Sequence, residues 1–153
     1  MLSFLKNLIN LNVALANKAR SVMAYDEALA FKEAKDYKHA LPLLIEASEL
    51  GNAQAMSILG TMYLMGQGVT EDGTQAVTWL QRSIDAGFEG AISVLGMAFA
   101  TGKAGIKIDL AKARELLTHC AENGDEQSAR MLSMIDNGEG MFKHLKGEPA
   151  KHR

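Results

Sequence analysis

The sequence predicts an all-α protein, a short α/α solenoid built of stacked antiparallel helix pairs. Two observations predict this fold. A stretch of small and apolar residues recurs about three dozen residues further along the chain, and each copy has its apolar residues at helical spacing. A repeat of this period is typical of solenoids, in which each helix pair buries its apolar face against the next pair.

The first helix of the repeat is clearest from Ala55 to Tyr63, a run that recurs from Ala91 to Phe99 with every position shifted by 36. In both runs the apolar residues fall on one face, which predicts an amphipathic helix. Each run has a glycine at its centre, Gly60 or Gly96, although glycine costs about 1 kcal/mol relative to alanine inside a helix. We therefore expect a neighbouring helix to pass close to both glycines.

The second helix of each repeat is predicted to begin after an aspartate and to end at a glycine. An aspartate at this place can cap the helix by accepting free amide N–H groups, and a glycine can adopt the left-handed conformation that ends it. The aspartates are Asp36, Asp72 and Asp109, and the glycines are Gly51, Gly87 and Gly124. These carboxylates are thus expected to be structural.

The repeat resembles the Sel-one-like repeat family, whose members are relatives of the tetratricopeptide repeats. The residues that carry the resemblance are Ala55, Leu59-Gly60, Tyr63, Gly66-Gln67-Gly68-Val69, Asp72, Ala76, Trp79 and Ala86-Gly87. The copy that follows keeps this frame but has Phe99 in place of the tyrosine and Leu116 in place of the tryptophan. The resemblance implies a right-handed solenoid and a non-enzymatic module that binds other proteins.

We expect one domain made of six consecutive parts. These are an N-terminal capping helix (1–21), a tetratricopeptide-like helix pair (22–51), two Sel-one-like repeats (52–87 and 88–124), a C-terminal capping helix (125–137) and a basic mobile tail (138–153). The capping helices would cover the apolar faces that terminal repeats cannot bury alone. An alternative for residues 2–20 is a helix on a membrane surface, but three asparagines and few cations argue against it.

The resemblance also implies where a polypeptide partner would bind, on the concave surface formed by the first helix of each pair. The positions on that surface are Tyr25, Leu29, Lys32, Gln54, Ser57, Thr61, Met65, Ser93, Met97, Thr101, Arg130 and Met134. Methionine side chains are flexible enough to adapt to a partner. A role in the core is the alternative for each of the three methionines.

The sequence predicts no catalytic residue, no metal site and no cofactor. The four histidines, His39, His119, His144 and His152, are not spaced as metal ligands, and the single cysteine falls at an apolar position of the repeat. Cys120 is therefore expected to be a buried thiol rather than a nucleophile. With one cysteine the chain cannot form an internal disulfide, which favours a cytoplasmic location.

Charge is distributed unevenly along the chain. Residues 21–138 carry 16 acidic and 9 basic side chains, a balance of −7, whereas both ends are basic. An acidic body repels nucleic acid and favours a basic protein partner, although an acidic surface can simply keep a protein soluble. We expect no nucleic acid or membrane as partner, and a monomer or weak homodimer.

Two other functions stay open at this point. One is a bacterial immunity protein that neutralises a toxin, since a small acidic domain without catalytic residues suits an inhibitor of a basic protein. The other is an enzyme of the β-lactam-hydrolysing type, a function associated with the cysteine-rich branch of the family. This chain lacks the repeated cysteine pairs of that branch.

Overall fold

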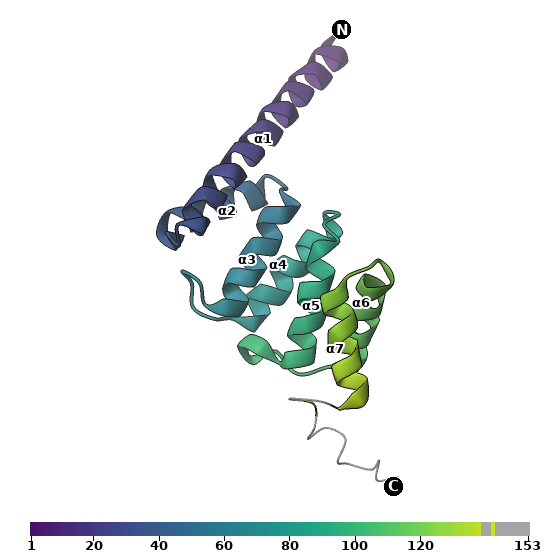
Figure 1. The fold of residues 1–153 in the computed structure, drawn as a ribbon. Helices are drawn as coiled ribbons and strands as arrows, with labels where there is room; N and C mark the ends of the chain where they lie inside the picture. The colour runs from purple at the N-terminus through teal and green to yellow at the C-terminus, as the bar shows by residue number, and fades with distance from the viewer. Residues whose placement is uncertain (139–141, 143–153) are drawn as a thin grey trace.

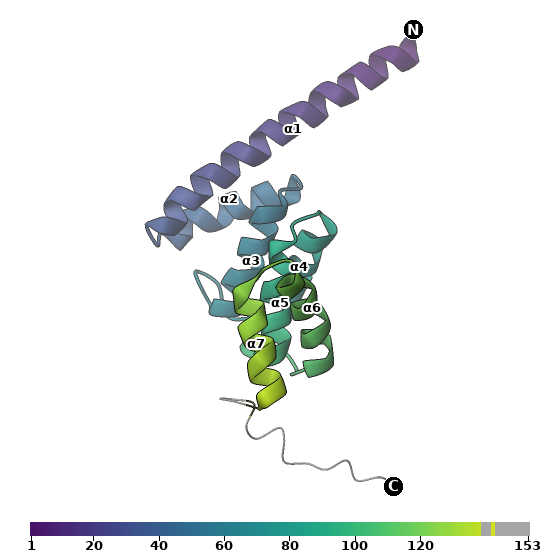
Figure 2. The same ribbon diagram turned by 45° about the vertical axis from the view of Figure 1, so that its right-hand side comes forward.

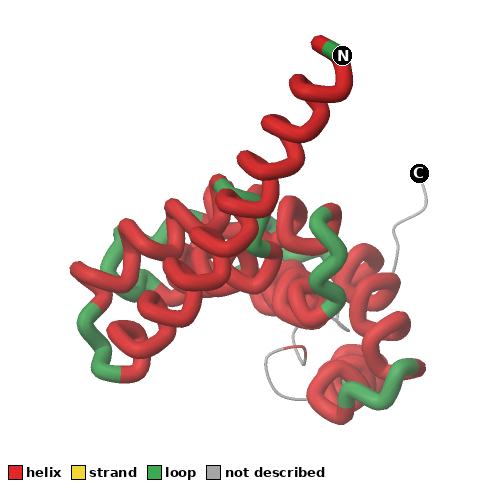
Figure 3. The backbone as a smooth tube through the Cα atoms, turned by 90° about the horizontal axis from the view of Figure 1, so that it is seen from above, coloured by secondary structure: helices red, strands yellow, loops and turns green. Residues whose placement is uncertain are grey.

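The computed structural model describes residues 1–138 and Phe142, and the regular structure in this part of the chain is entirely helical (Figures 1 and 3). The helices are α1 (Leu2–Glu33), α2 (Tyr37–Glu49), α3 (Ala53–Met65), α4 (Gly73–Asp85), α5 (Gly90–Thr101), α6 (Leu110–Glu122) and α7 (Glu126–Asn137), with a short 3₁₀ turn, η1 (Lys103–Gly105). The all-α prediction is confirmed.

The helices stack in the order of the sequence. α1 packs against α2, α3 against α4, and α5 against α6, and each pair contacts the next through α2 with α3 and α4 with α5. α7 packs against both α5 and α6 and ends the stack (Figure 1). α3 also contacts α5 directly, so the first helices of successive pairs lie side by side, as in the predicted solenoid of antiparallel helix pairs.

Local capping fixes where the second helices begin and end. Asp72 accepts hydrogen bonds from the backbone N–H groups of Thr74 at 2.8 Å and Gln75 at 3.0 Å, and Asp36 and Asp109 accept them in the same way at the starts of α2 and α6. The predicted terminal glycines, at 51, 87 and 124, have φ angles of +89°, +93° and +92°. The structural role predicted for these aspartates and glycines is therefore confirmed.

The two central glycines lie where the second helix of the pair packs tightly against the first. A Cβ atom on Gly60 would stand 2.6 Å from Cγ of Leu80 in α4, and one on Gly96 would stand 2.9 Å from Cγ of Leu117 in α6. Real Cβ contacts are longer than this, so the paired helices could not pack as they do with a larger residue at either place. The predicted close approach is confirmed.

Three clusters of buried side chains form the core along the stack. Leu59 lies in the first, with residues of α1 and α2; Leu95 lies in the second, with residues of α3 and α4. The third lies between α5, α6 and α7 and includes Phe142, which is 2% exposed. Phe142 belongs to the segment expected to form a basic tail, and in the structure it packs into this cluster. Residues 139–141 and 143–153 lie outside the described residues.

The N-terminal helix differs from the expected cap. No helix ends near residue 21, because α1 runs without interruption from Leu2 to Glu33 and every residue from 1 to 20 is exposed. Figures 1 and 2 show this part of α1 extending away from the stack. The buried residues of α1 are Ser21, Ala24 and Ala28, and they form the face that packs on α2. Asn17 and Asn10 precede Ala24 by 7 and 14 residues, so they lie on the same face of the helix. A polar face of this kind cannot cover an apolar core.

Candidate functional site

The twelve residues predicted to bind a partner all lie on α1, α3, α5 and α7. Three of them are exposed: Gln54 on α3, Arg130 on α7, and Met65 at the end of α3, whose side chain is 53% exposed. Most of the others are half-buried: Tyr25, Leu29, Lys32, Thr61, Ser93, Met97, Thr101 and Met134. α3 contacts α5, and α5 contacts α7. The predicted binding residues on these three helices therefore lie on neighbouring helices.

Several of the twelve side chains pack against other parts of the protein. Ser57 is only 7% exposed, so it contributes almost nothing to the surface. Met97 and Met134 pack against the third core cluster, and Tyr25 packs against the first. Burial, with the nearby Asp26 carboxylate as a smaller cause, raises the pKa of the Tyr25 phenol above its ordinary value. The alternative of a core role thus holds in part for two of the three methionines.

The hydroxyl groups on this face are used within their own helices. Thr61 Oγ1 donates to the carbonyl of Ser57 at 3.0 Å, and Thr101 Oγ1 donates to the carbonyl of Met97 at 2.9 Å. A satisfied hydroxyl presents mainly its methyl group to a partner. Together with Met65, these side chains make the α3–α5 part of the face weakly polar and uncharged.

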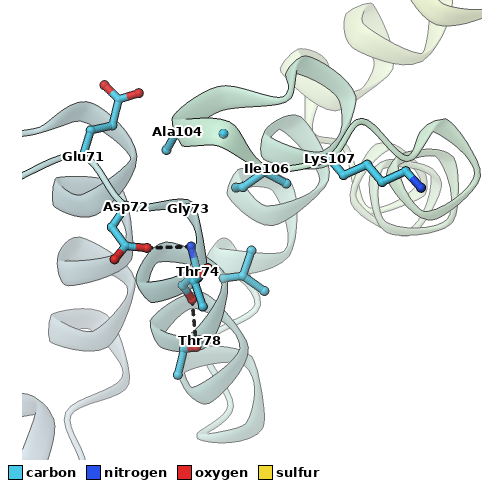
Figure 4. A pocket seen from close by; sticks show the side chains of 10 residues that line it. Glu71, Asp72, Gly73, Thr74, Thr78, Ala104, Ile106 and Lys107 are labelled. Atoms are coloured by element: carbon cyan, nitrogen blue, oxygen red, sulfur yellow. Dashed lines mark hydrogen bonds between the residues drawn. The ribbon is translucent and has the colours of Figure 1, made fainter.

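A cleft of about 560 Å³, lined by none of the twelve residues, lies between the start of α4 and the loop that contains η1 (Figure 4). A Cβ atom on Gly73 would stand 2.5 Å from the carbonyl oxygen of Ala104, so the loop rests directly on the first turn of α4. The two carboxylates at its edge are engaged: Asp72 caps α4, and Glu71 pairs with Lys103 at 3.2 Å. Figure 4 shows Lys107 directed away from Asp72, so the cleft gathers no set of reacting groups.

A smaller cleft of about 180 Å³ holds Cys120 and His119 beside Ser93 and Asp125. Burial of the Cys120 thiol, reinforced by the carboxylates of Asp125 and Glu89, raises its pKa above the ordinary 9.0. The thiol is therefore protonated at neutral pH and is a poor nucleophile. The expectation that Cys120 is a buried thiol is confirmed.

Two partly exposed capping carboxylates, Asp36 and Asp125, should make the stability of the fold depend on pH in the acid range. A side-chain hydrogen bond with His39 lowers the pKa of Asp36 below 3.8, and one with the Ser128 hydroxyl lowers that of Asp125. Because the unfolded chain binds more protons at these groups, the stability they add is present above pH 3.8 and is lost as the pH falls through the lowered values. Urea unfolding followed at decreasing pH should show this loss.

The double variant Asp36→Asn and Asp125→Asn keeps an oxygen acceptor at each cap but cannot titrate. Its stability should therefore fall less steeply with acid than that of the unaltered chain. Glu122→Gln, at the exposed end of α6, is the matched control that removes a charge elsewhere. An equal slope in the double variant and the unaltered chain would contradict the assignment.

Among the residues that the structure describes, no group of three or more histidine, cysteine, aspartate or glutamate side chains is placed to hold a metal ion. His144 and His152 lie outside that part of the chain. Within the same residues, none of the helices combines the length and apolar character that crossing a bilayer requires.

Stacked antiparallel helix pairs that bury their apolar faces against one another define an α/α-repeat protein. More narrowly, the chain belongs to the Sel1 repeat family: the family model described as Sel1 repeat matches residues 23–52, 53–88 and 91–125. The resemblance drawn from the sequence is thereby confirmed. Sel1 repeats generally act as protein-interaction modules.

Solved structures with the same fold include three informative ones. A Sel1 repeat protein from Oxalobacter formigenes is 26% identical with a TM-score of 0.63, over 84% of this chain and 98% of that one. The protective antigen c5321 of uropathogenic Escherichia coli is 27% identical with a TM-score of 0.60, over 89% of this chain but only 28% of the antigen. Cysteine-rich protein B of Helicobacter pylori shares the fold alone. It is 19% identical with a TM-score of 0.58, over 80% of this chain and 94% of that one. A comparison with curated protein sequences gave no match.

The sequence interpretation missed two surface features. One is the cleft beside Gly73, which depends on a loop where Ala104 takes a positive φ of +57°. The other is the exposed apolar side of α1, whose residues were expected to face the first repeat. Their helical spacing was visible in the sequence, but the polar face opposite them, with Asn10 and Asn17, was the signal that the helix does not cover the core.

Proposed function

We propose that the chain is a non-enzymatic module that binds a polypeptide on the face formed by α1, α3, α5 and α7. The observation that carries the proposal is the row of partly exposed side chains that adjoining first helices present, in a family of interaction modules. Thr61, Met65 and Thr101 form its uncharged middle, with Lys32 on α1 and Arg130 on α7 towards its ends. Such a face suits a partner that contributes apolar side chains.

The charge of the body supports a basic partner. Residues 21–138 carry an excess of seven acidic side chains, and a field of this sign speeds the encounter with a positively charged protein. The attraction is long-range, so it should raise the association rate at low salt more than it strengthens the final complex. Association that slows as salt is added is the expected behaviour.

The other two functions gain no support. The comparisons give nothing in favour of an immunity protein, and the single cysteine leaves the β-lactam-hydrolysing reading without the cysteine pairs that it requires. The carboxylates beside the larger cleft serve caps and an ion pair, as described above. A cytoplasmic location remains a prediction.

Capture of partners by the tagged chain, followed by mass spectrometry and binding measurements with the purified partner, tests the proposal. Thr61→Arg combined with Met65→Arg places two bulky cations on the face, and the dissociation constant should rise about tenfold or more. The matched control is Thr78→Arg with Gln81→Arg on exposed positions of α4, because Thr78 Oγ1 donates to a carbonyl four residues earlier, just as Thr61 Oγ1 does.

The control variant should bind as the unaltered chain does, and circular dichroism should show both variants folded. If the α4 variant lost the partner and the α3 variant kept it, the binding face would lie on the second helices instead. The proposed face would then be abandoned.

A further inference from the structure

The projecting part of α1 carries a broad apolar surface that nothing in the described chain covers. Ten large apolar residues between positions 2 and 23 are each from 43% to 78% exposed. They are Leu2, Phe4, Leu5, Leu8, Ile9, Leu11, Val13, Leu15, Val22 and Met23. We call this set the α1 stripe. Monomeric proteins rarely expose so many neighbouring apolar side chains, so the stripe indicates a docking surface.

The α1 stripe faces away from the rest of the protein. At 100° per residue its members fall within an arc of about 200° of the helix, and the buried Ser21, Ala24 and Ala28 fall on the opposite side. From Leu2 to Leu15 the stripe can therefore be covered without contact with the stack, whereas Lys18 already lines a small hollow with Asn52 and Gly87. Figures 1 and 2 show the first turns of α1 standing clear of the other helices, and the later turns, from about Arg20, lying against α2.

The apolar residues of the stripe are spaced as in helices that form coiled coils. Phe4, Leu8, Leu11, Leu15 and Val22 follow steps of four and three residues, with a lysine at the one intermediate step. This alternation keeps one seam of a helix facing a partner helix. It is sustained over nearly three heptads, about 30 Å of helix.

Side-chain sizes along the stripe favour an antiparallel partner with the same sequence. A second row beside the first consists of Leu5, Ile9, Asn12, Ala16, Ala19 and Met23. When two copies run in opposite directions, Ile9 of one lies opposite Ala19 of the other, so a large residue fills the space beside a small one. In a parallel pair each alanine would face its own copy and leave a gap.

The charges point the same way. Just beyond the stripe lie Asp26 and Glu27, both exposed, whereas residues 1–25 carry three cations and no acid. An antiparallel pair places the positive amino end of one helix beside these two carboxylates of the other. An anionic lipid surface fits less well, because the two carboxylates and the acidic body would be repelled and Arg20 already pairs with Glu46.

We propose that two copies of the chain associate through antiparallel pairing of their α1 stripes. The two stacks then stand at opposite ends of the helix pair. The association is independent of the partner-binding function proposed above.

Light scattering or sedimentation of the full chain at micromolar concentration tests the proposal. The unaltered chain should have twice the monomer mass of 16.5 kDa. Leu8→Glu with Leu15→Glu puts two charges in the seam and should raise the dimer dissociation constant at least about a hundredfold. Asn10→Glu with Asn17→Glu makes the same change in charge on the opposite face of the same helix and should leave the dimer intact.

Cross-linking tests the direction of pairing. In a Cys120→Ser background, chains with Phe4→Cys are mixed with chains with Met23→Cys and oxidised; an antiparallel pair should give the mixed disulfide. Disulfides between two copies of Phe4→Cys would overturn the antiparallel arrangement. If the unaltered chain were monomeric, the dimer would be overturned altogether. If that monomer also bound phosphatidylglycerol vesicles, and the variant with Leu8→Glu and Leu15→Glu did not, the stripe would be assigned to lipid binding instead.

Discussion

Replacing Leu95 with alanine is expected to lower the free energy of unfolding by about 2–5 kcal/mol. Leu95 is 1% exposed and lies in the second core cluster with Leu64, Leu80 and Ala98, where α3, α4 and α5 meet. Removing its branched end takes apolar contacts from two neighbouring repeats at once. The loss includes the cavity left behind, because closely packed helices relax only in part.

Urea unfolding followed by circular dichroism measures the effect. The control is Met65→Ala, which removes a flexible apolar side chain of similar size from a position that is 53% exposed, and it should change the stability by about 0.5 kcal/mol or less. If Leu95→Ala also cost less than this, the second cluster would not join adjoining repeats as described.

Replacing Gly60 with valine is the second substitution expected to have a large effect. Valine is a slightly better helix former than glycine, which alone would stabilise α3 by a few tenths of a kcal/mol. The first carbon of its side chain would nevertheless meet Leu80 Cγ at 2.6 Å and the carbonyl oxygen of Ala76 at 3.1 Å. Both belong to α4, and Leu80 is fully buried. We expect a net loss of about 1–3 kcal/mol from overpacking.

A double-mutant cycle separates this clash from a change in helix propensity. Leu80→Ala alone should destabilise the protein, but in the presence of Gly60→Val it also removes the obstructing side chain, so the combined loss should be smaller than the sum of the two. Gln54→Val, at an exposed position of the same helix, is the control for propensity. Simple additivity in the cycle would show that Gly60 and Leu80 are not in contact.

The candidate binding face could be predicted only in part. The register of the repeat correctly assigned its residues to the first helices, because helical spacing determines which residues share a face. It did not determine exposure: Ser57 is buried and Met97 packs on the third cluster, since both depend on how closely α3, α5 and α7 approach. Whether a partner binds there is a proposal that the α3 and α4 variants test.

The larger cleft shows a similar limit. Gly73 follows a capping aspartate in the sequence, and nothing in that local pattern indicates that the loop at Ala104 rests on it. The contact joins residues about thirty positions apart in neighbouring repeats. Spacing within a single repeat carries no information about such a contact.

The sequence by itself determined the repeat, the helix starts at Asp72 and Asp109, the ends at Gly87 and Gly124, and the need for glycine at position 60. Each of these follows from hydrogen bonds or steric limits within one helix pair, which local spacing expresses directly. Only the tertiary structure decided that α1 continues past the first repeat with its apolar stripe uncovered and that Phe142 enters the core. An apolar face requires a cover, and the spacing that reveals the face leaves open which part of the chain, or which second molecule, provides it.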